Sequence, residues 1–587
     1  MDVAKLFEPV ATIRRRRTAP LVLELDLTEG ITDEPPGDPL GQLAAMRRQR
    51  LFDTVEGIRR GARDPRVRAL VVKIGSAPIG MAKVQELRQA VAVFRRAGKT
   101  AVAWSESFGE FGPGSVPYYL ATAFDEIVLL PSGSVGLTGV TAENTFFGEA
   151  VEKLGIDYQV GARHEYKTAV NVFTERGFTE AHREASGRIV ESFTEQIVAG
   201  ISEGRGLSEE TVRSLIDRGP FLAAEALEAG LVDRLAYRDE VYTDLLERCS
   251  APDAPARLQY VSRYQRSRSL ADRVPAAAPR NGYVALISGV GQIVPGHSRR
   301  SPLGGGAAMG SETVAAAFRA ARKDPHVRAV VFRVDSPGGS YSASDVIWRE
   351  VVLTSLAGIP VVVSMGEVAG SGGYFVAAGA DLIVAQPGTI TGSIGVFVGK
   401  AVLSGLLGRL GITSDSLDGG RHAGMFSSNR PFSDTEWERV NAMLDHIYDD
   451  FVGKVAEGRG MTREQVHEVA RGRVWTGQDA LARGLVDEVG GIETAVRLAR
   501  DRAGLPPFAP VRHFPRLGPL ERLVPAESSE DRAAQARLRL SAWGPLADLS
   551  ARLGLPAAGP LVMPGTWVVR GSRPRSSPRR WPTSRPG

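Results

Sequence analysis

Cysteine is almost absent from this chain of 587 residues, and its scarcity excludes several kinds of site. The single cysteine, Cys249, cannot form an internal disulfide or a cysteine metal cage, and no catalytic motif surrounds it. The eight histidines are scattered, without an HExxH motif or another paired spacing that would hold a metal ion. The sequence therefore predicts no metal site and argues against a cysteine nucleophile.

Long hydrophobic runs are also absent. No stretch approaches the roughly 18 apolar residues that a membrane-spanning helix needs. The apolar segment at 18–26 is short and interrupted by charge, so we interpret it as a first strand rather than a signal peptide. Basic residues gather near the ends, at 14–17 and at 573–585. Such runs contact anionic lipid or nucleic acid in some proteins and are solvated tails in more of them.

The chain has the length and composition of a multidomain globular protein. Hydrophobic residues make up 43% of it and charged residues 24%, which is typical of a soluble protein. A chain of 587 residues exceeds what one hydrophobic core can organise, so we expect two or more domains.

An internal repeat defines those domains. Four segments of the first half recur in the second half at an offset of 256 or 260 residues. The matching pairs are 64–74 with 324–334, 97–103 with 357–363, 118–125 with 374–381, and 131–140 with 387–396. A period of this length indicates duplicated domains rather than a solenoid.

Each copy alternates apolar strand segments with helical segments. In the second copy we predict strands at 282–287, 327–334 and 359–364, and helices at 313–322 and 343–356. The strands are rich in valine and isoleucine and barely alternate with polar residues, which predicts an α/β fold with mainly parallel, buried sheets. Helical extensions are predicted after each core, at 178–250 and 433–503.

The pattern divides the chain into five parts. They are a basic N-terminal segment at 1–17, the first copy at 18–250, a linker at 251–281, the second copy at 282–510, and a C-terminal extension at 511–587 whose tail after 564 is expected to be disordered.

Ser371 lies at the centre of the most informative stretch. It follows an apolar strand segment, is flanked by Gly370, Gly372 and Gly373, and precedes a predicted helix at 374–381. Glycines permit unusual backbone angles and the close approach of a substrate chain. The stretch is typical of a nucleophile on a strand-to-helix turn, although a glycine-rich turn with a capping serine would have the same composition.

A second glycine turn follows the strand that ends at Val334. The sequence there is Asp-Ser-Pro-Gly-Gly-Ser, and ligands of parallel sheets bind at this end of the strands. Gly338 or Gly339 could donate one backbone hydrogen bond to an oxyanion, and Gly372 the other. The alternative is an ordinary turn.

Three linked motifs resemble a known family. The segments 333–340 (RVDSPGGS), 369–374 (AGSGGY) and 391–395 (TGSIG) are similar to those of the signal peptide peptidase A family, also called protease IV, in its long duplicated form. The resemblance covers about residues 20–505. It implies a ClpP/crotonase-like fold in each copy and a Ser-Lys dyad, with the serine from the second copy and the lysine from the first.

The resemblance indicates Lys167 as the general base, because Tyr-Lys-Thr-Ala at 166–169 matches the family's lysine motif. The corresponding stretch of the second copy, 419–425, has no lysine. A lysine base must be neutral near pH 7, against an ordinary pKa of about 10.4, and burial would lower the pKa. Ser393 is a candidate to orient the amine, or it is a turn cap. Ser115, opposite Ser371 in the repeat, lacks the two following glycines, so we interpret the first copy's own serine site as decayed.

The resemblance implies a serine endopeptidase that degrades cleaved signal peptides and other apolar or unfolded segments through an acyl-enzyme. It implies a homotetramer and no metal or organic cofactor, and no nucleic-acid partner is expected. The family is usually membrane-anchored, but this chain shows no anchor, so we expect a peripheral membrane or cytoplasmic location. Two alternatives are an acyl-CoA hydratase or isomerase of the crotonase type and a non-catalytic scaffold.

Overall fold

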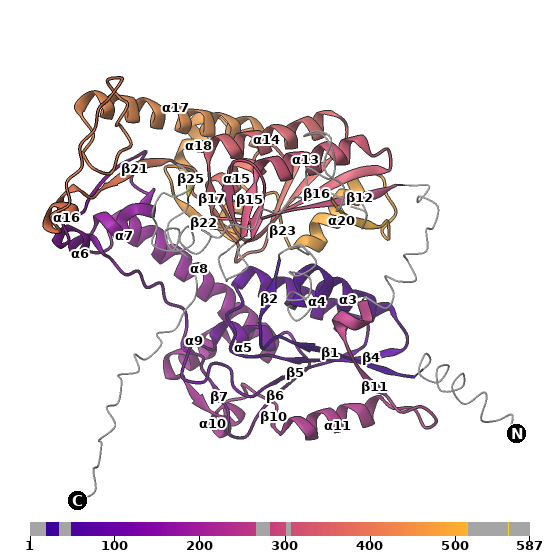
Figure 1. The fold of residues 1–587 in the computed structure, drawn as a ribbon. Helices are drawn as coiled ribbons and strands as arrows, with labels where there is room; N and C mark the ends of the chain where they lie inside the picture. Colours follow the sequence, from indigo (N-terminus) through magenta and orange to yellow (C-terminus); the bar gives the residue numbers. More distant parts are fainter. Residues whose placement is uncertain (1–18, 34–48, 266–281, 301–306, 515–560, 563–587) are drawn as a thin grey trace, which may run out of the picture.

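The computed structural model describes residues 19–33, 49–265, 282–300, 307–514 and 561–562. The predicted basic segment at 1–17, the predicted tail after 564 and most of the C-terminal extension lie outside the described residues, as does the part of the linker at 266–281. Figure 1 shows two α/β lobes, with the sheet of the first copy below that of the second. Within the described ranges, no helix is both long and apolar enough to span a bilayer.

The described part of the first copy is built on a six-stranded sheet whose neighbouring strands all run parallel. In sheet order the strands are β10 (Arg234–Leu235), β6 (Glu126–Leu129), β5 (Thr100–Ser105), β4 (Val67–Lys73), β1 (Leu21–Asp26) and β11 (Arg257–Tyr260). One face is covered by α3 (Leu51–Arg63), α4 (Met81–Arg96) and α5 (Ser115–Ala121), and the other by α11 (Arg238–Cys249). Burial on both faces explains the nearly continuous apolar strands.

The second copy repeats this arrangement on an eight-stranded sheet among the described residues, with one antiparallel pair, β20 with β22. Its main path is β22 (Val474–Thr476), β20 (Ile390–Gly392), β18 (Val361–Gly370), β16 (Val327–Ser336), β12 (Tyr283–Val290) and β24 (Val511–Phe514). Off this path, β19 (Leu382–Ala385) pairs with β18, and β23 (Glu488–Val489) pairs with β19. One face is covered by α13 (Ser311–Lys323), α14 (Tyr341–Leu356) and α15 (Gly372–Ala377), and the other by α20 (Ile492–Arg502).

The helical extensions are repeated as well. α8 (Glu180–Arg205) and α17 (Asp434–Arg459) each have 26 residues and end at Gly206 and Gly460, which adopt the left-handed conformation of a helix C-terminal cap. Shorter helices follow each of them: α9 (Glu209–Arg218) and α10 (Ala223–Glu228) in the first copy, α18 (Arg463–Val469) and α19 (Gly477–Ala482) in the second. The predicted helical segments after each core therefore match the structure.

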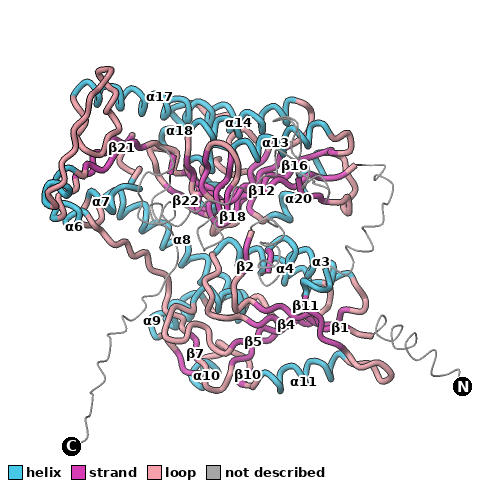
Figure 2. Tube along the Cα trace, in the orientation of Figure 1, coloured by secondary structure: helices cyan, strands magenta, loops and turns pink. Residues whose placement is uncertain are grey.

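Two arms join the copies at one side of the molecule. β8 (Asp157–Ala162) of the first copy pairs antiparallel with β21 (Phe397–Val402) of the second over six residue pairs. The short helices α6 (Gly148–Lys153), α7 (Asn171–Thr174) and α16 (Ser404–Arg409) lie beside this ribbon (Figure 1). Figure 2 shows α6 and α7 as helices next to strand β21. The arm of the first copy leads directly from β8 to Lys167 and the 3-10 helix η1 (Thr168–Val170).

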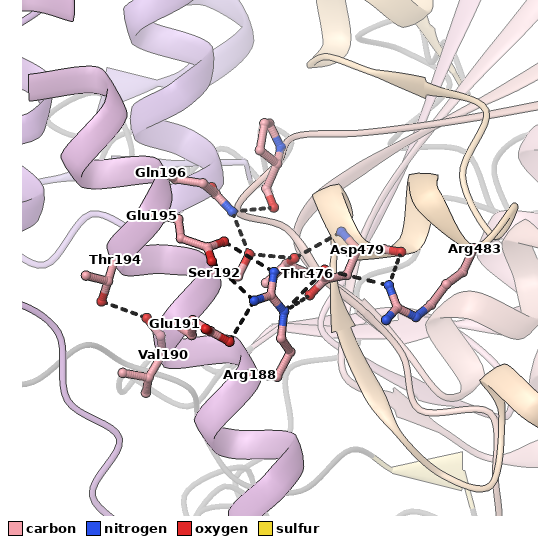
Figure 3. Close-up of polar contacts among 11 residues, drawn as sticks. Arg188, Val190, Glu191, Ser192, Thr194, Glu195, Gln196, Thr476, Asp479 and Arg483 are labelled. Carbon is pink, nitrogen blue, oxygen red and sulfur yellow. Dashed lines mark hydrogen bonds and ion pairs between the residues drawn. The ribbon is translucent and has the colours of Figure 1, made fainter. Parts of the chain in front are cut away.

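Helix α8 forms a second junction, which is largely polar. The guanidinium of Arg188 on α8 pairs with the carboxylate of Asp479 on α19, with Nε 3.0 Å from Oδ2. One and two turns further along, Ser192 contacts Thr476 at 3.0 Å and Gln196 donates to the Pro387 carbonyl at 3.1 Å. Figure 3 shows these side chains facing one another across the two copies. The copies are thus in contact both at the paired arms and along α8.

Candidate active site

Ser371 follows β18 directly and begins α15. Its backbone adopts φ 53° and ψ −115°, a conformation that a serine rarely takes, and its side chain is fully buried. The Ser371 N–H donates to the Gly392 carbonyl at 2.8 Å, which ties the turn to β20. A Cβ on Gly373 would lie 2.6 Å from the Ser336 carbonyl oxygen. The glycine is therefore required by close packing against the neighbouring turn.

Lys167 reaches Ser371 from the other copy. Its Nζ lies 2.9 Å from Oγ of Ser371, 3.0 Å from Oγ of Ser393 and 3.1 Å from the Ser393 carbonyl oxygen. Lys167 is 2% exposed, and burial lowers the pKa of its amine to about 7. The structure thus brings together the three side chains that sequence analysis selected, and the lowered pKa gives the lysine a neutral fraction near pH 7 that an exposed lysine lacks.

The two candidate oxyanion turns also lie side by side. β17 (Gly338–Gly339) follows β16, and a Cβ on Gly372 would lie 3.1 Å from both the Gly338 Cα and the Gly339 N. The Gly338 N–H donates to Ser336 Oγ at 3.2 Å, so it already has a partner. Gly339 is itself paired with Ile293 and Leu561 in the strand ladder, so both glycines stay candidates for the donor that would accompany Gly372.

β17 is paired on both sides. On one side it runs parallel to β13 (Gln292–Val294), with Ile293 opposite Gly339. On the other side it pairs antiparallel with β25, the two-residue strand Leu561–Val562, with Gly339 opposite Leu561. The edge of the glycine turn therefore accepts an extended polypeptide beside Ser371.

The corresponding place in the first copy has different contacts. Ser115 Oγ accepts hydrogen bonds from the N–H groups of Thr138 and Gly139, at 3.2 and 2.9 Å. The residue opposite Ser393 in the repeat is Leu137, which is buried and has no hydroxyl. Among the described residues, no lysine hydrogen bond to Ser115 is present.

Sequence analysis missed a buried network of charges that joins the copies behind the site. Arg333, which is 2% exposed, pairs with Asp33 at 3.1 Å and with Glu86 at 2.7 Å, both from the first copy. Glu367, four residues before Ser371, accepts from the Lys83 N–H at 3.3 Å. Burial raises the pKa of Glu367 to about 7, although the Lys83 ammonium opposes that rise. Arg333, inside the otherwise apolar run 329–334, was the signal available in the sequence.

No group of three or more histidine, cysteine, aspartate or glutamate side chains with metal-binding geometry occurs in the described ranges. The polar groups beside Ser371 are hydroxyls, one amine and backbone amides. Chemically, this arrangement can activate a serine oxygen and stabilise negative charge on a substrate oxygen.

Comparison with known proteins gives consistent matches. The sequence model of peptidase family S49 matches residues 94–250 and 355–506, one range in each copy. The chain is 33% identical to the serine protease SPPA, chloroplastic, of Arabidopsis thaliana over 454 residues, which cover 77% of this chain and 65% of that protein. It is 32% identical to protease 4 of Salmonella typhi over 510 residues, which cover 83% of this chain and 79% of that protein. Among solved structures, a mutant of ClpP1 from Listeria monocytogenes aligns with 36% of this chain and 94% of its own, at 14% identity and a TM-score of 0.23.

Proposed function

Because the chain belongs to peptidase family S49 and is a serine peptidase, we propose that it hydrolyses peptide bonds with a dyad of Ser371 and Lys167. The observation that carries this proposal is the 2.9 Å contact between the buried Lys167 amine and the Ser371 hydroxyl oxygen. A neutral amine has two N–H groups and one lone pair. The two oxygens of Ser393 suit the N–H groups, which leaves the lone pair for the hydroxyl proton of Ser371.

In the proposed acylation step, Lys167 takes the proton from Ser371 as Oγ attacks the peptide carbonyl carbon. The carbonyl oxygen becomes an oxyanion, which the N–H groups of Gly372 and of Gly338 or Gly339 stabilise. The carbon–nitrogen bond then breaks, and the Lys167 ammonium gives its proton to the leaving amine. The product is an ester between Ser371 and the acyl part of the substrate.

Deacylation uses the same groups, with water as the nucleophile and Ser371 Oγ as the leaving group. Lys167 removes a proton from a water molecule, whose oxygen attacks the ester carbon, and the second oxyanion occupies the same site as the first. When the ester bond breaks, the proton returns from Lys167 to Ser371 Oγ. The carboxylic acid product leaves, and the serine and the neutral amine are restored.

We propose that the substrate binds as an extended strand beside β17. The antiparallel pairing of Leu561 with Gly339 supports this, because it has the backbone geometry in which proteins add a peptide to a free strand edge. The resemblance to signal peptide peptidase A supports cleaved signal peptides and other apolar or unfolded segments as substrates. Assembly into a homotetramer and peripheral contact with a membrane remain predictions, which light scattering and co-sedimentation with lipid vesicles would test.

The proposed function is tested by cleavage of a fluorogenic apolar peptide. Ser371→Ala and Lys167→Met should each reduce kcat by about 10³-fold or more, as removal of a nucleophile or its base does. Two matched controls are Ser115→Ala, the serine of the first copy, and Lys400→Met, a second buried lysine, whose amine donates to the Met425 carbonyl at 2.7 Å.

Both controls should retain wild-type kcat. Full activity in Lys167→Met would contradict the lysine assignment. Hydration of an acyl-CoA substrate would support the crotonase-type alternative, and peptide binding without cleavage by the wild-type protein would support a scaffold.

A further inference from the structure

The loop that carries Lys167 is held by one short segment of the second copy. This segment, Arg471-Gly472-Arg473, lies between α18 and β22 and meets Glu165, Tyr166 and Lys167. We propose that the segment Arg471–Arg473 positions Lys167 against Ser371, with Gly472 as its central contact. The inference deepens the proposed function and rests on it, because it concerns the placement of the proposed base.

Gly472 makes the closest approach. A Cβ on this residue would lie 2.6 Å from the Lys167 N and 2.7 Å from the Lys167 Cα, so the two backbones are in direct contact. Gly472 also has φ +84°, which strongly favours glycine. On its far side, a Cβ on Gly395 would lie 2.7 Å from the Gly472 Cα and 3.3 Å from the Lys167 Cδ. A larger residue at Gly472 would have to displace the Lys167 backbone, and one at Gly395 would have to displace Gly472.

The same segment holds Ser393, the other partner of the amine. The Ser393 N–H donates to the Arg473 carbonyl at 2.7 Å, and the Gly472 N–H donates to the Ile394 carbonyl at 2.8 Å. The segment therefore fixes the backbone of Lys167 on one side and the backbone of Ser393 on the other. A displacement of the segment would change both contacts of the amine at once.

Side chains add to the backbone contacts. Arg471 forms an ion pair with Glu165, and Arg473 forms one with Glu184 at 2.6 Å. The Tyr166 hydroxyl donates to the same Glu184 at 2.6 Å, while the Arg473 guanidinium lies 4.9 Å from the centre of the Tyr166 ring. These ion pairs are partly exposed and individually weak, so we assign the larger part of the positioning to Gly472.

Positioning matters here because the lysine side chain is long and comes from a different copy than the serine. Displacement of a catalytic group by about 1 Å can cost about 10²-fold in rate. The amine is also desolvated only while the loop is packed, and its pKa of about 7 depends on that burial. A displaced loop would therefore lower kcat and raise the pH at which activity appears.

The test compares two alanine substitutions at glycines of positive φ. Gly472→Ala places a methyl group against the Lys167 backbone, whereas Gly484→Ala, at φ +71°, places one in open space. We expect Gly472→Ala to lower kcat about 10²-fold with KM within about twofold of wild type, and to shift the acidic midpoint of kcat/KM upward. Gly484→Ala carries similar backbone strain and should keep the kinetics and the pH midpoint of the wild type.

A second pair of variants decides the matter if Gly472→Ala does not fold. Arg473 and Arg483 both stack on Trp475, at 4.3 and 3.7 Å from the ring centre, but only Arg473 contacts the lysine loop. Arg473→Met should lower kcat about tenfold and raise the pH midpoint, and Arg483→Met should change neither.

The inference would be overturned if a folded Gly472→Ala kept the kcat and pH midpoint of the wild type, or if Gly472→Ala and Gly484→Ala lost the same amount of kcat. If Gly472→Ala does not fold, the arginine pair decides. Wild-type kinetics in Arg473→Met, or equal losses of kcat in Arg473→Met and Arg483→Met, would then overturn the inference. An active Lys167→Met would instead overturn the proposed function itself, and the inference with it.

Discussion

Lys167 and Ser371 are separated by 204 positions in the chain, and the Nζ of the lysine lies 2.9 Å from the Oγ of the serine. The two residues come from different copies of a duplicated domain. The first copy supplies the lysine, while its own serine, Ser115, is bonded to the N–H groups of Thr138 and Gly139. The duplication has therefore produced one candidate site from two related scaffolds, and the predictions below follow from how that site is assembled.

The pH dependence of activity should report the Lys167 amine. Burial lowers its pKa to about 7, and only the neutral amine can accept the serine proton. We expect log kcat/KM to rise with a slope of one below pH 7 and to flatten above it, measured with the fluorogenic peptide between pH 5 and about 9.5. Ser115→Ala should give the same profile. A midpoint near the ordinary lysine value would show that the amine is solvated.

Lys167→Met should stabilise the fold while abolishing activity. Between pH 7 and 10.5 the unfolded chain binds a proton at this lysine that the folded chain does not. Burial of the lysine therefore lowers the free energy of unfolding at pH 7, and this loss becomes smaller as the pH rises toward 10.5. The cost at pH 7 is roughly 5 kcal/mol at most. We expect a higher Tm for Lys167→Met at pH 7 by calorimetry, and a difference that shrinks toward pH 10.

Ser371→Ala is the control for that measurement, because it is expected to be inactive but keeps the lysine. An equal Tm for Lys167→Met and wild type at pH 7, or a difference that grows with pH, would contradict the account of a desolvated amine.

Ser393→Ala should lower activity by less than loss of the dyad. The substitution removes the hydroxyl 3.0 Å from the Lys167 amine but leaves the carbonyl oxygen at 3.1 Å, so one of two orienting hydrogen bonds remains. We expect kcat to fall about tenfold with little change in KM, measured at the pH optimum of each variant. Ser393→Thr, which retains a hydroxyl, is the conservative comparison. A loss as large as that of Ser371→Ala would indicate a direct chemical role.

Denaturant should separate the copies before it unfolds them. Most of the buried apolar residues lie in a separate cluster in each copy, although the cluster of the first copy extends to Ile390 and Val474 of the second. The contacts of α8 with the second copy include polar ones such as Arg188 with Asp479. We expect activity to be lost at a lower urea concentration than secondary structure, which far-UV circular dichroism measures. Arg188→Met should widen the difference between the two urea midpoints. The substitution leaves the nearly buried Asp479 carboxylate with only the longer contact to Arg483, at 3.6 Å.

Arg205→Met is the matched control on the same helix, because Arg205 pairs with Asp233 within the first copy. It should leave the gap between the two transitions unchanged. Coincident loss of activity and secondary structure in the wild type would show that the copies unfold as a single unit.

The family and the fold class were predictable from sequence, and both predictions are confirmed. Valine-rich strands that are buried on both faces leave a local pattern, and the repeat shows which segments correspond. The strand predicted at 327–334 is part of β16, and the helix predicted at 343–356 is part of α14. The predicted strand at 359–364 is extended in the structure, because β18 continues to Gly370 and ends against Ser371.

Contacts across the copies could not be predicted in the same way. The hydrogen bond from the Gly338 N–H to Ser336 Oγ depends on the orientation of the serine side chain, which no sequence pattern specifies. The contact between Gly472 and Lys167 joins two loops from different copies. Nothing in the local sequence distinguishes Gly472 from a glycine in an ordinary turn. The roles of Ser371, Lys167, Ser393 and the oxyanion glycines therefore remain predictions, supported by geometry.

The paired arms have a consequence for enzyme kinetics in dilute solution. β8 and β21 belong to one polypeptide and carry the lysine and serine scaffolds toward each other within it. Assembly of the site from Lys167 and Ser371 is consequently intramolecular, so its equilibrium does not depend on the protein concentration. Specific activity should stay constant as the enzyme is diluted into the nanomolar range, even where any larger assembly of the chain has come apart.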